Sequence, residues 1–506
     1  MNFLKIGNAS ELAGSDRMAY RLFEILPAFL SVATLLLLIV FSYFQPVFVA
    51  YFIILFDIYW LLLVVYLSIH LFYAYSRMMK NIKIDWKDKC QNIKSWDEII
   101  HLIIFPTYNE PAEVILPSFQ ALIDDGYPTD KMIVVLATEE REGRKAALKA
   151  EYIKNIFGNK FRDFLVTIHP DNINGELKGK GANQAWAAKT VKERIIDKEN
   201  LNYDKILVSV FDIDTIINKG YFFRLSYAFL TVKNPYRASY QPIPVYHNNV
   251  WRAPFFARVA ASSNTFWQMM QQIRSEKLAT YSSHSMTWRA LADIGFWSTT
   301  MVSEDSRIFW HCFCFYKGDY RVEPLYFPVS MDVTMDISLL QTAINLYKQQ
   351  RRWGWGVENI PYLIFNTYKN WRCYPMKSFI NRIFIQLYGF HSWATNALII
   401  GVIGWMPMLL GGDRFNSSVL SSNLPVVTRT LMIVAMFGLV FSAIISSRLL
   451  PPRPAGTRAY KSVSMVLQWL ILPFSIIVFG TIPGLEAQIR LAIGKYLGFW
   501  VTPKTR

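Results

Sequence analysis

Two carboxylates stand two positions apart at Asp212 and Asp214, directly after a run of mostly apolar residues. The run 208–211 is β-prone and predicts a buried strand of a central sheet. Open α/β sheets bind ligands at the carboxyl ends of their strands. An Asp-x-Asp pair there can hold Mg²⁺ or Mn²⁺ through oxygen atoms, with phosphates completing the coordination shell. A lone pair of this kind is more often a turn or a cap after a strand, so its meaning depends on the rest of the chain.

The triplet Ser303-Glu304-Asp305 offers a second pair of carboxylates. Asp305 can serve as a general base that removes the proton of an acceptor hydroxyl. The carboxylate of Glu304 beside it would help to set the pKa of Asp305. Taken alone, the triplet is more typical of a helix N-cap.

A polar and aromatic cluster follows at Gln349, Arg352 and Trp353. Arg352 can pair with a diphosphate through a bidentate fork, and Gln349 can hydrogen-bond a sugar. Trp353 can offer an apolar ring face to the same sugar. Near a membrane, basic and aromatic residues are also common as interfacial anchors.

The composition indicates that membrane segments position these residues. Hydrophobic residues make up 53% of the 506-residue chain, which is too apolar for an ordinary soluble enzyme. The net charge of +16 fits positive-inside loops and anionic lipid, with an anionic substrate as a second explanation. No nucleic-acid-binding pattern is present, so no nucleic-acid partner is expected. The four cysteines lack zinc spacing, which fits a reducing cytosolic face.

Two apolar runs near the N-terminus, residues 25–44 and 48–73, predict a membrane hairpin broken at Gln45-Pro46. Asp57 is the one acidic residue of the second run, and we expect it to face protein or a polar channel. The basic cluster that follows places the next domain in the cytosol: Arg77, Lys80, Lys83, Lys87 and Lys89.

The next stretch predicts an α/β fold with a mostly parallel, Rossmann-like sheet. Strand patterns alternate with helical patterns; the strands are at 99–105, 131–136, 164–168 and 208–211, and the helices at 117–126, 145–157 and 182–196. Three apolar runs follow, at about 384–410, 431–445 and 463–480. The predicted organisation is a cytosolic segment 1–24, a hairpin 25–73, a catalytic domain 74–338, interfacial helices 339–375, a membrane region 376–483 and a C-terminal amphipathic helix and segment 484–506.

The order of the motifs resembles family 2 glycosyltransferases with a GT-A fold, in the membrane-embedded, cellulose-synthase-like branch. The matching motifs, in order, are Pro106-Thr107-Tyr108-Asn109-Glu110, Lys178-Gly179-Lys180-Gly181-Ala182-Asn183, Asp212-x-Asp214, Ser303-Glu304-Asp305, Gln349-x-x-Arg352-Trp353 and Phe499-Trp500-Val501-Thr502-Pro503-Lys504. Six matches in order over residues 106–504 make chance improbable.

The resemblance implies an inverting transfer from a nucleotide sugar, with UDP-sugar as the expected donor and a glycan or a membrane lipid as acceptor. It implies that Asp212 and Asp214 bind Mg²⁺ or Mn²⁺ and that Asp305, with Glu304, is catalytic. It assigns donor contacts to Thr107, Asn109, Glu110, Glu139, Lys180, Asp212 and Arg352, acceptor contacts to Gln349, Trp353 and His284, and gating to Phe499, Val501, Thr502 and Lys504.

The chain departs from the family pattern at two places. The acidic pair after the second strand is replaced by Thr138-Glu139-Glu140, and Glu139 is our choice for the contact to the nucleobase. The usual acceptor segment is replaced by residues 281–285, where His284 could contact the acceptor or be a structural histidine. The sugar and its linkage therefore do not carry over from the family.

The span count conflicts with a gating role for residues 499–504. If this segment reaches a cytosolic active site, an even number of crossings must separate residues 376 and 484. Three apolar runs are present, so one is not a simple span. Pro473 at the centre of 463–480 favours a re-entrant path for that run. The alternative is that residues 376–410 hold two short crossings, but this would place the basic loop 446–462 outside.

We therefore predict an integral, multi-pass enzyme of the plasma or inner membrane with a cytosolic catalytic domain. Its leading function is processive synthesis of a β-linked polysaccharide coupled to translocation. The alternatives are the transfer of a single sugar to a membrane lipid and a catalytically inactive channel or scaffold. The sequence identifies no partner subunit.

Overall fold

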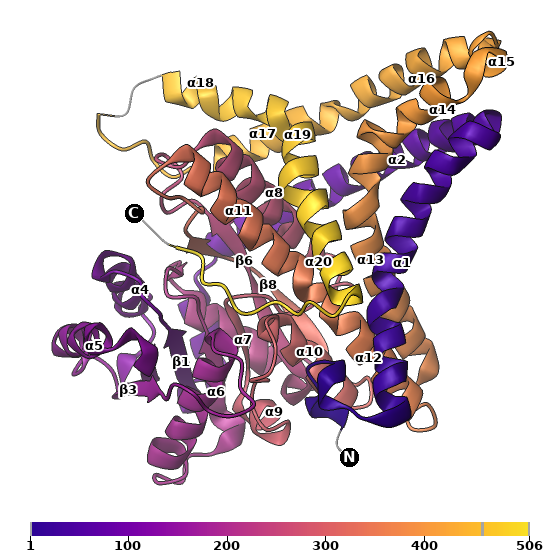
Figure 1. The fold of residues 1–506 in the computed structure, drawn as a ribbon. Helices are drawn as coiled ribbons and strands as arrows, with labels where there is room; N and C mark the ends of the chain where they lie inside the picture. Colours follow the sequence, from indigo (N-terminus) through magenta and orange to yellow (C-terminus); the bar gives the residue numbers. More distant parts are fainter. Residues whose placement is uncertain (1–2, 457–459, 504–506) are drawn as a thin grey trace.

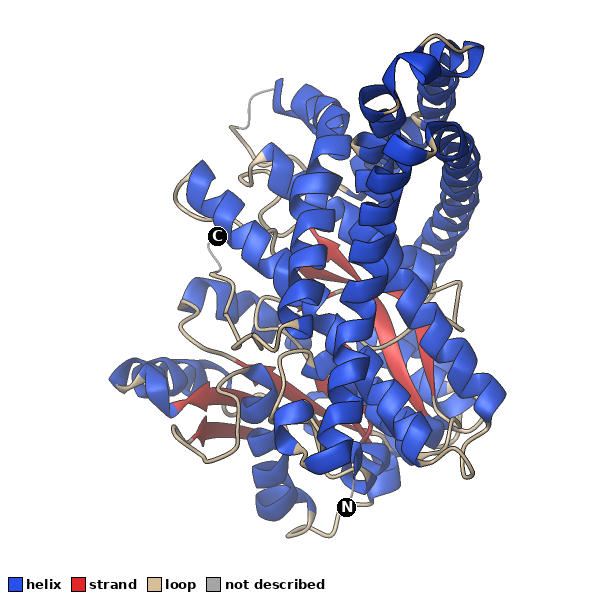
Figure 2. Cartoon of the chain, turned by 45° about the vertical axis from the view of Figure 1, so that its right-hand side comes forward, coloured by secondary structure: helices blue, strands red, loops and turns tan. Residues whose placement is uncertain are grey.

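The structure is a computed structural model that describes residues 3–456 and 460–503. An α/β domain forms the lower part of the molecule in Figure 1, and long helices from both ends of the chain form the upper right. The strands gather in one region, whereas the upper part is helical (Figure 2). This arrangement confirms the predicted fold class: an α/β domain flanked by apolar helices.

One eight-stranded sheet runs through the α/β domain in the order β3-β2-β1-β4-β7-β6-β8-β5. Its first four strands are parallel, whereas β7 runs antiparallel to both β4 and β6. The strands are β1 (Ile100–Pro106), β2 (Met132–Glu139), β3 (Asp163–His169), β4 (Ile206–Val210), β5 (Ile216–Ile217), β6 (Ala238–Tyr246), β7 (His284–Thr287) and β8 (Arg321–Met331). The parallel half matches the predicted strands, and β5 to β8 were not predicted.

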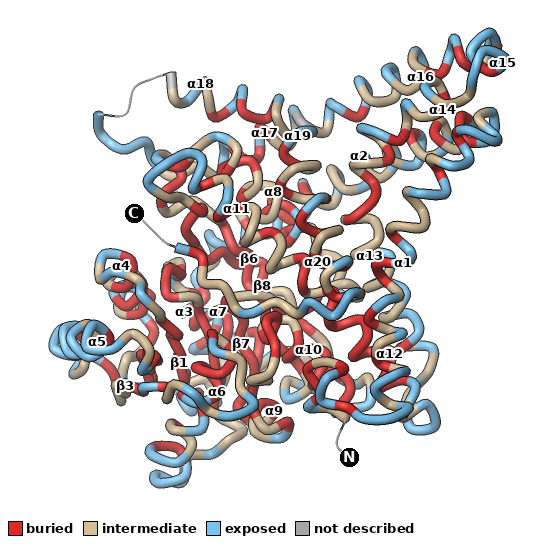
Figure 3. The backbone as a smooth tube through the Cα atoms, in the orientation of Figure 1, coloured by how far each residue is buried: buried red, intermediate tan, exposed pale blue. Residues whose placement is uncertain are grey.

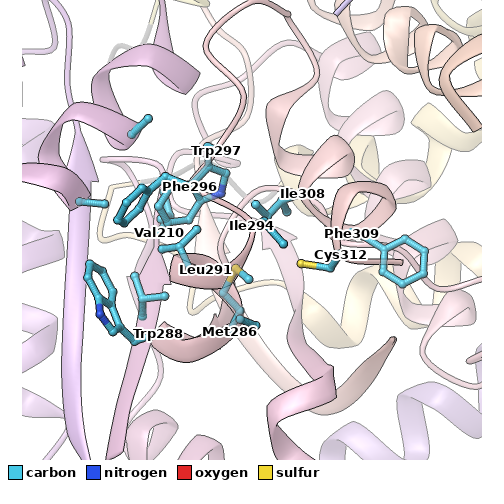
Figure 4. Packing of buried hydrophobic residues seen from close by; sticks show 14 of the residues in the cluster. Val210, Met286, Trp288, Leu291, Ile294, Phe296, Trp297, Ile308, Phe309 and Cys312 are labelled. Carbon is cyan, nitrogen blue, oxygen red and sulfur yellow. The ribbon is translucent and has the colours of Figure 1, made fainter. Parts of the chain in front are cut away.

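Alternate side chains of the central strands fill two separate cores, as the twofold period of a strand requires. Leu102 and Ile104 of β1 lie in one apolar cluster, and Ile103 and Phe105 lie in the other. The first cluster joins strands β4 and β7 to helices α9 (Trp288–Asp293) and α10 (Glu304–Phe315), and Figure 4 shows part of this packing. Burial is densest over the sheet and the helices against it (Figure 3). The core therefore fixes α10 against the strand that ends before Asp212.

Helices cover both faces of the sheet and join it to the apolar part. Those within the α/β domain are α3 (Trp86–Gln91), α4 (Ala112–Asp124), α5 (Arg144–Phe157), α6 (Lys180–Val191), α7 (Tyr221–Thr231) and α8 (Phe255–Gln271). Those that follow it are α11 (Leu339–Gly354), α12 (Asn359–Lys369), α13 (Met376–Gly401), α14 (Met406–Leu410), α15 (Gly412–Asn416), α16 (Val419–Ala435), α17 (Phe437–Leu449), α18 (Tyr460–Leu467), α19 (Leu472–Ile476) and α20 (Ile482–Ala492).

The first two apolar runs form a helical hairpin, α1 (Gly14–Phe44) and α2 (Pro46–Ile82), joined at Gln45. Proline suits the first position of α2 because its missing N–H has no intrahelical partner there. Asp57 is fully buried, as predicted for a carboxylate inside a span. The described residues contain four helices long and apolar enough to cross a membrane, or five if the bent pair formed by 376–401 and 403–410 is one span.

The last apolar run, which is one of these four helices (residues 461–492), packs against the α/β domain. Lys461 donates to the Trp251 carbonyl at 3.3 Å, and Phe479 stacks on Phe256. The run ends in α20, where Glu486 pairs with Arg351 at 2.8 Å. In contrast, the end of α14 reaches the turn of the first hairpin, since a Cβ at Gly411 would contact Pro46. The strong bend predicted near Pro473 is instead found between residues 401 and 403.

Candidate active site

The carboxyl end of β4 places Asp212 and Asp214 in a shallow, charged site. Lys180, the first residue of α6, lies 2.7 Å from Asp212 Oδ1 through its ammonium group. Ser282 donates a short hydrogen bond to Asp212 Oδ2. Asp214 is buried, and its Oδ2 accepts from the backbone N–H of Asp332 at 3.0 Å. Hydrogen bonds thus fix the orientation of both carboxylates, and Asp212 forms an ion pair with the ammonium group of Lys180.

The acidic pair of α10 converges on the same lysine. Glu304 is buried, and its Oε1 lies 4.0 Å from Lys180 Nζ. Burial, with the charge of Asp305 as the next cause, raises the pKa of Glu304 to about 8. Burial also raises the pKa of Asp305, against the opposing charge of Lys180. The close approach needs Gly181, because a Cβ there would lie 3.1 Å from the Glu304 Cβ.

Helix α11 brings Gln349, Arg352 and Trp353 to the rim of this site. Gln349 Oε1 accepts from the hydroxyl of Thr334 at 2.7 Å. A cavity beside it is lined by Tyr246, Ala257, Ala261, Asp332, Thr334, Leu346, Gln349, Gln350 and Trp353. Aromatic rings, an amide and a carboxylate in one cavity suit a polyhydroxylated ligand. Asp332 therefore connects the Asp-x-Asp pair to this cavity.

Arg352 keeps a hydrogen-bond donor available. Its Nε is buried and has no hydrogen-bond partner among the described residues, and its guanidinium lies 5.2 Å from the centre of the Phe499 ring. A buried donor without a partner costs about 1–3 kcal/mol. An anion bound there would recover this energy.

The loop after β1 is closed on itself. Glu110 Oε2 accepts from the Thr107 hydroxyl at 2.8 Å and from the Tyr108 N–H at 2.6 Å. Asn109 takes a left-handed conformation (φ 63°), which asparagine tolerates, and its N–H donates to Glu142. Glu110 therefore shapes the loop and would reach a ligand only after rearrangement.

A second pocket lies at the ends of β2 and β3. Glu139 is buried and paired with Arg141, whose guanidinium lies 3.9 Å from the centre of the Tyr108 ring. The pocket is lined by Glu139, Arg141, His169, Pro170, Asp171, Asn172, Ile173, Glu176 and Lys178. Lys178 pairs with Asp171 at 2.6 Å. Glu139 thus lies at the end of β2, and its carboxylate forms an ion pair with Arg141. Its contact with a nucleobase stays a prediction.

His284 lies at the start of β7, opposite Val210 in the strand pairing. It is buried, its Nδ1 lies 2.9 Å from the Tyr281 carbonyl, and its Nε2 has no partner among the described residues. Burial lowers its pKa to about 4, so the ring is neutral at pH 7. It does not line the Gln349–Trp353 cavity, and its contact with an acceptor stays a prediction.

The C-terminal segment 493–503 crosses the front of the α/β domain toward α4 (Figure 1). Phe499 lies so close to Gly179 that a Cβ on the glycine would come within 2.5 Å of its ring. Thr502 is buried, with no hydrogen-bond partner for its hydroxyl among the described residues. Val501 is partly buried, and Lys504 lies outside the described residues. The segment therefore lies at the active site, on the same side of the apolar helices as the α/β domain.

Three residues of the site were not predicted: Asp332, Arg141 and Glu358. No motif marks Asp332 or Glu358, since their contacts join chain segments that only folding brings together. Arg141 lies two positions after Glu139, so the spacing alone could have indicated this pair. Glu358 accepts from Ser303 N at 3.0 Å across 55 positions of sequence, and Asp332 contacts Asp214 across 118.

Comparisons with known proteins identify the family of the chain. The family model described as Glycosyl transferase family group 2 matches residues 207–480, more than half of the chain. No curated protein sequence matches. Among solved structures, the chain is similar to the crystal structure of S. aureus TarS, with 14% identity and a TM-score of 0.33. That match covers 69% of this chain and 55% of the TarS chain, little more than half of its length.

Proposed function

The chain belongs to glycosyl transferase family group 2, and we propose that it is a membrane-embedded, metal-dependent, inverting glycosyltransferase of the cellulose-synthase-like branch. The observation that carries this proposal is that Lys180 lies within ion-pair distance of one carboxylate from each acidic pair, Asp212 of the first and Glu304 of the second. A transferase needs one charged group for the leaving diphosphate and another for the incoming hydroxyl, within one sugar's reach.

In this proposal the donor is a nucleotide sugar, with its nucleobase in the Glu139–Arg141 pocket and its diphosphate near Lys180 and Arg352. The unpaired Nε of Arg352 and the ammonium of Lys180 supply positive charge where the diphosphate would lie. Thr107, Asn109 and Glu110 shape the loop between these two subsites. UDP is the nucleotide expected from the family resemblance.

Asp212 and Asp214 fit Mg²⁺ or Mn²⁺ by the chemistry of their donor atoms. Both offer hard carboxylate oxygens, and the Lys180 contact shows that Asp212 Oδ1 accepts a cation. The described residues hold no group of three or more His, Cys, Asp or Glu side chains that could enclose a metal by themselves. Phosphate oxygens and waters would therefore complete the shell. When bound, the ion would neutralise charge on the departing diphosphate.

Asp305 is the proposed base. It accepts the proton of the acceptor hydroxyl as that oxygen forms a bond to the anomeric carbon of the donor sugar. The bond from that carbon to the diphosphate oxygen breaks, and the nucleoside diphosphate leaves. A single base on the face opposite the leaving group gives inversion. Burial favours this role, since the raised pKa of Asp305 makes it a stronger base.

The acceptor site is the cavity at Gln349 and Trp353. Ala257, Ala261 and Leu346 in its wall belong to the same apolar cluster as Phe479 of the last apolar run. The cavity thus borders the apolar helices, which supports synthesis coupled to translocation. The position of Phe499 at Gly179 supports a gate that closes over the donor. A membrane orientation with the α/β domain in the cytosol of a plasma or inner membrane follows from the basic residues after α2.

The test is a donor screen with purified protein in detergent, Mg²⁺ or Mn²⁺ and a panel of nucleotide sugars. Release of nucleoside diphosphate that depends on Asp305 is expected, with Asp305→Asn as the matched inactive protein. A long product supports processive synthesis, whereas single additions to a lipid acceptor support the alternative. Release that survives Asp305→Asn in full would reject the assignment of the base.

A further inference from the structure

Helix α10, which carries the proposed base, is held at its start by a residue from outside the helix. Ser303 is the N-cap of α10, but its side chain makes no capping bond to the helix. Instead, its N–H and its hydroxyl both donate to Glu358 Oε1, at 3.0 and 2.6 Å. The position of the first turn of α10 therefore depends on Glu358.

Glu358 is a buried carboxylate with both oxygens engaged. Its Oε2 accepts from Trp355 Nε1 at 2.9 Å, within the same short helix η9 (Trp355–Glu358). It is 6% exposed, so its bonds do not compete with bulk water. Hydrogen bonds to a charged group are stronger than those between neutral groups. The clamp on Ser303 is thus strong enough to fix the geometry of the turn.

Arg307, one turn further along α10, makes a second link to the same region. Its Nε donates to Asn359 Oδ1 at 2.7 Å, and its Nη2 donates to the Glu358 carbonyl at 3.2 Å. Nη1 donates to the carbonyl of Ile6 at 2.8 Å. Asn359 in turn donates to the hydroxyl of Ser306 at 2.9 Å. Two points on α10, one turn apart, are therefore bound to residues 358–359.

This link bears on catalysis because it joins two separate parts of the site. Glu358 stands six positions after Arg352, and Ser303 stands two positions before Asp305. The base and the proposed diphosphate ligand come from different helices, and Glu358, in the short helix that follows α11, bonds to the start of α10. A misplacement of about 1 Å between reacting groups can lower a rate by about 10²-fold.

We propose that Glu358 is a positioning residue that sets the distance between Asp305 and Arg352. This inference rests on the proposed function for its catalytic consequence, but not for its structural one. Removal of the carboxylate should lower the rate of the chemical step while the donor pocket at Glu139 and Arg141 stays intact.

The test compares Glu358→Ala with Glu358→Gln in purified protein. Alanine removes both contacts and should lower kcat at least tenfold, with the KM for the nucleotide sugar and the Kd for the nucleoside diphosphate within twofold of wild type. Glutamine keeps an oxygen that can accept from Ser303 and should recover most of the lost kcat. Glu151→Ala, which truncates an exposed glutamate of α5, is the matched control and should stay near wild type.

Amide hydrogen exchange of a peptide spanning residues 300–307 tests whether Glu358 holds the start of α10, and this measurement does not require enzymatic activity. We expect exchange at least tenfold faster in Glu358→Ala than in wild type, with Glu358→Gln between them. Unchanged exchange, unchanged kcat or an equal loss of nucleotide affinity and kcat would overturn the positioning role. Wild-type protein that turns over no nucleotide sugar would instead count against the proposed function, while the exchange result would still decide the role of Glu358.

Discussion

Gly179→Ala should lift the C-terminal segment from the active site. A Cβ at this position would lie 2.5–2.8 Å from three atoms of the Phe499 side chain. Carbon atoms in ordinary contact are about 3.5–4.0 Å apart, so the ring must retreat by roughly 1 Å. Overpacking of this kind costs ~1–3 kcal/mol, and ~1.4 kcal/mol changes an equilibrium about tenfold. Turnover should fall accordingly, because a displaced segment no longer covers the donor.

The displacement can be measured without turnover, by labelling a cysteine in the segment. Thr502 is 7% exposed, and Thr502→Cys changes its volume little. The only exposed cysteine among the described residues is Cys373, whereas the other three are buried: Cys90, Cys312 and Cys314. Cys373→Ser therefore removes the native thiol that would react with the label. We expect a water-soluble maleimide to label Thr502→Cys about tenfold faster when Gly179→Ala is added.

Two further variants separate the contact from other effects. Gly498→Ala is the matched control, because a Cβ there meets nothing within 4 Å, and labelling should not change. Phe499→Ala removes the ring, so Gly179→Ala should add no further increase in that background. An unchanged labelling rate in Gly179→Ala, or fully additive effects of the two substitutions, would refute the proposed contact.

Three other outcomes are expected. Asp305→Asn should lower kcat by about 10²–10⁴-fold with nucleotide affinity retained, as measured by turnover and calorimetry; equal losses in both would contradict a base. Turnover should rise with pH as Asp305 ionises, because burial raises the pKa of Asp305 above its usual range and only the ionised carboxylate accepts a proton; a pH profile that falls from neutral to alkaline pH would contradict a carboxylate base. Chelation should abolish nucleotide release and added Mn²⁺ or Mg²⁺ should restore it; activity that survives chelation would reject metal dependence. Ser282→Ala, which removes the hydroxyl that donates to Asp212 Oδ2, should weaken metal activation by about 10-fold or more.

The last apolar run shows how far the path of a helix can be predicted from the sequence. The gating hypothesis required an even number of crossings, and that count stays a prediction. The structure places Phe499 beside Gly179, where a gate would lie. Pro473 drew attention to residues 463–480 as the bent run, but the strong bend lies between residues 401 and 403. Proline marks a local break in hydrogen bonding, whereas the direction of a helix depends on what it packs against.

The sequence by itself determined the chemistry of the site. The apolar period of 208–211, the order of the motifs and the long apolar runs predict an α/β domain between membrane helices, because each is a local pattern of residue types. Asp212, Lys180, Glu304 and Arg352 were predicted in the same way. The tertiary structure alone decided how they meet: Lys180 lies against both Asp212 and Glu304, and Ser282 donates to Asp212 from 70 positions away.

Long-range contacts account for this difference. Asp332 meets Asp214, and Glu358 holds the start of α10, only because the sheet and its helices bring distant segments together. Neither carboxylate has a local pattern that separates it from an ordinary surface residue. Residue types and spacing thus specify which groups are available for catalysis, and packing across the fold specifies the distances between them.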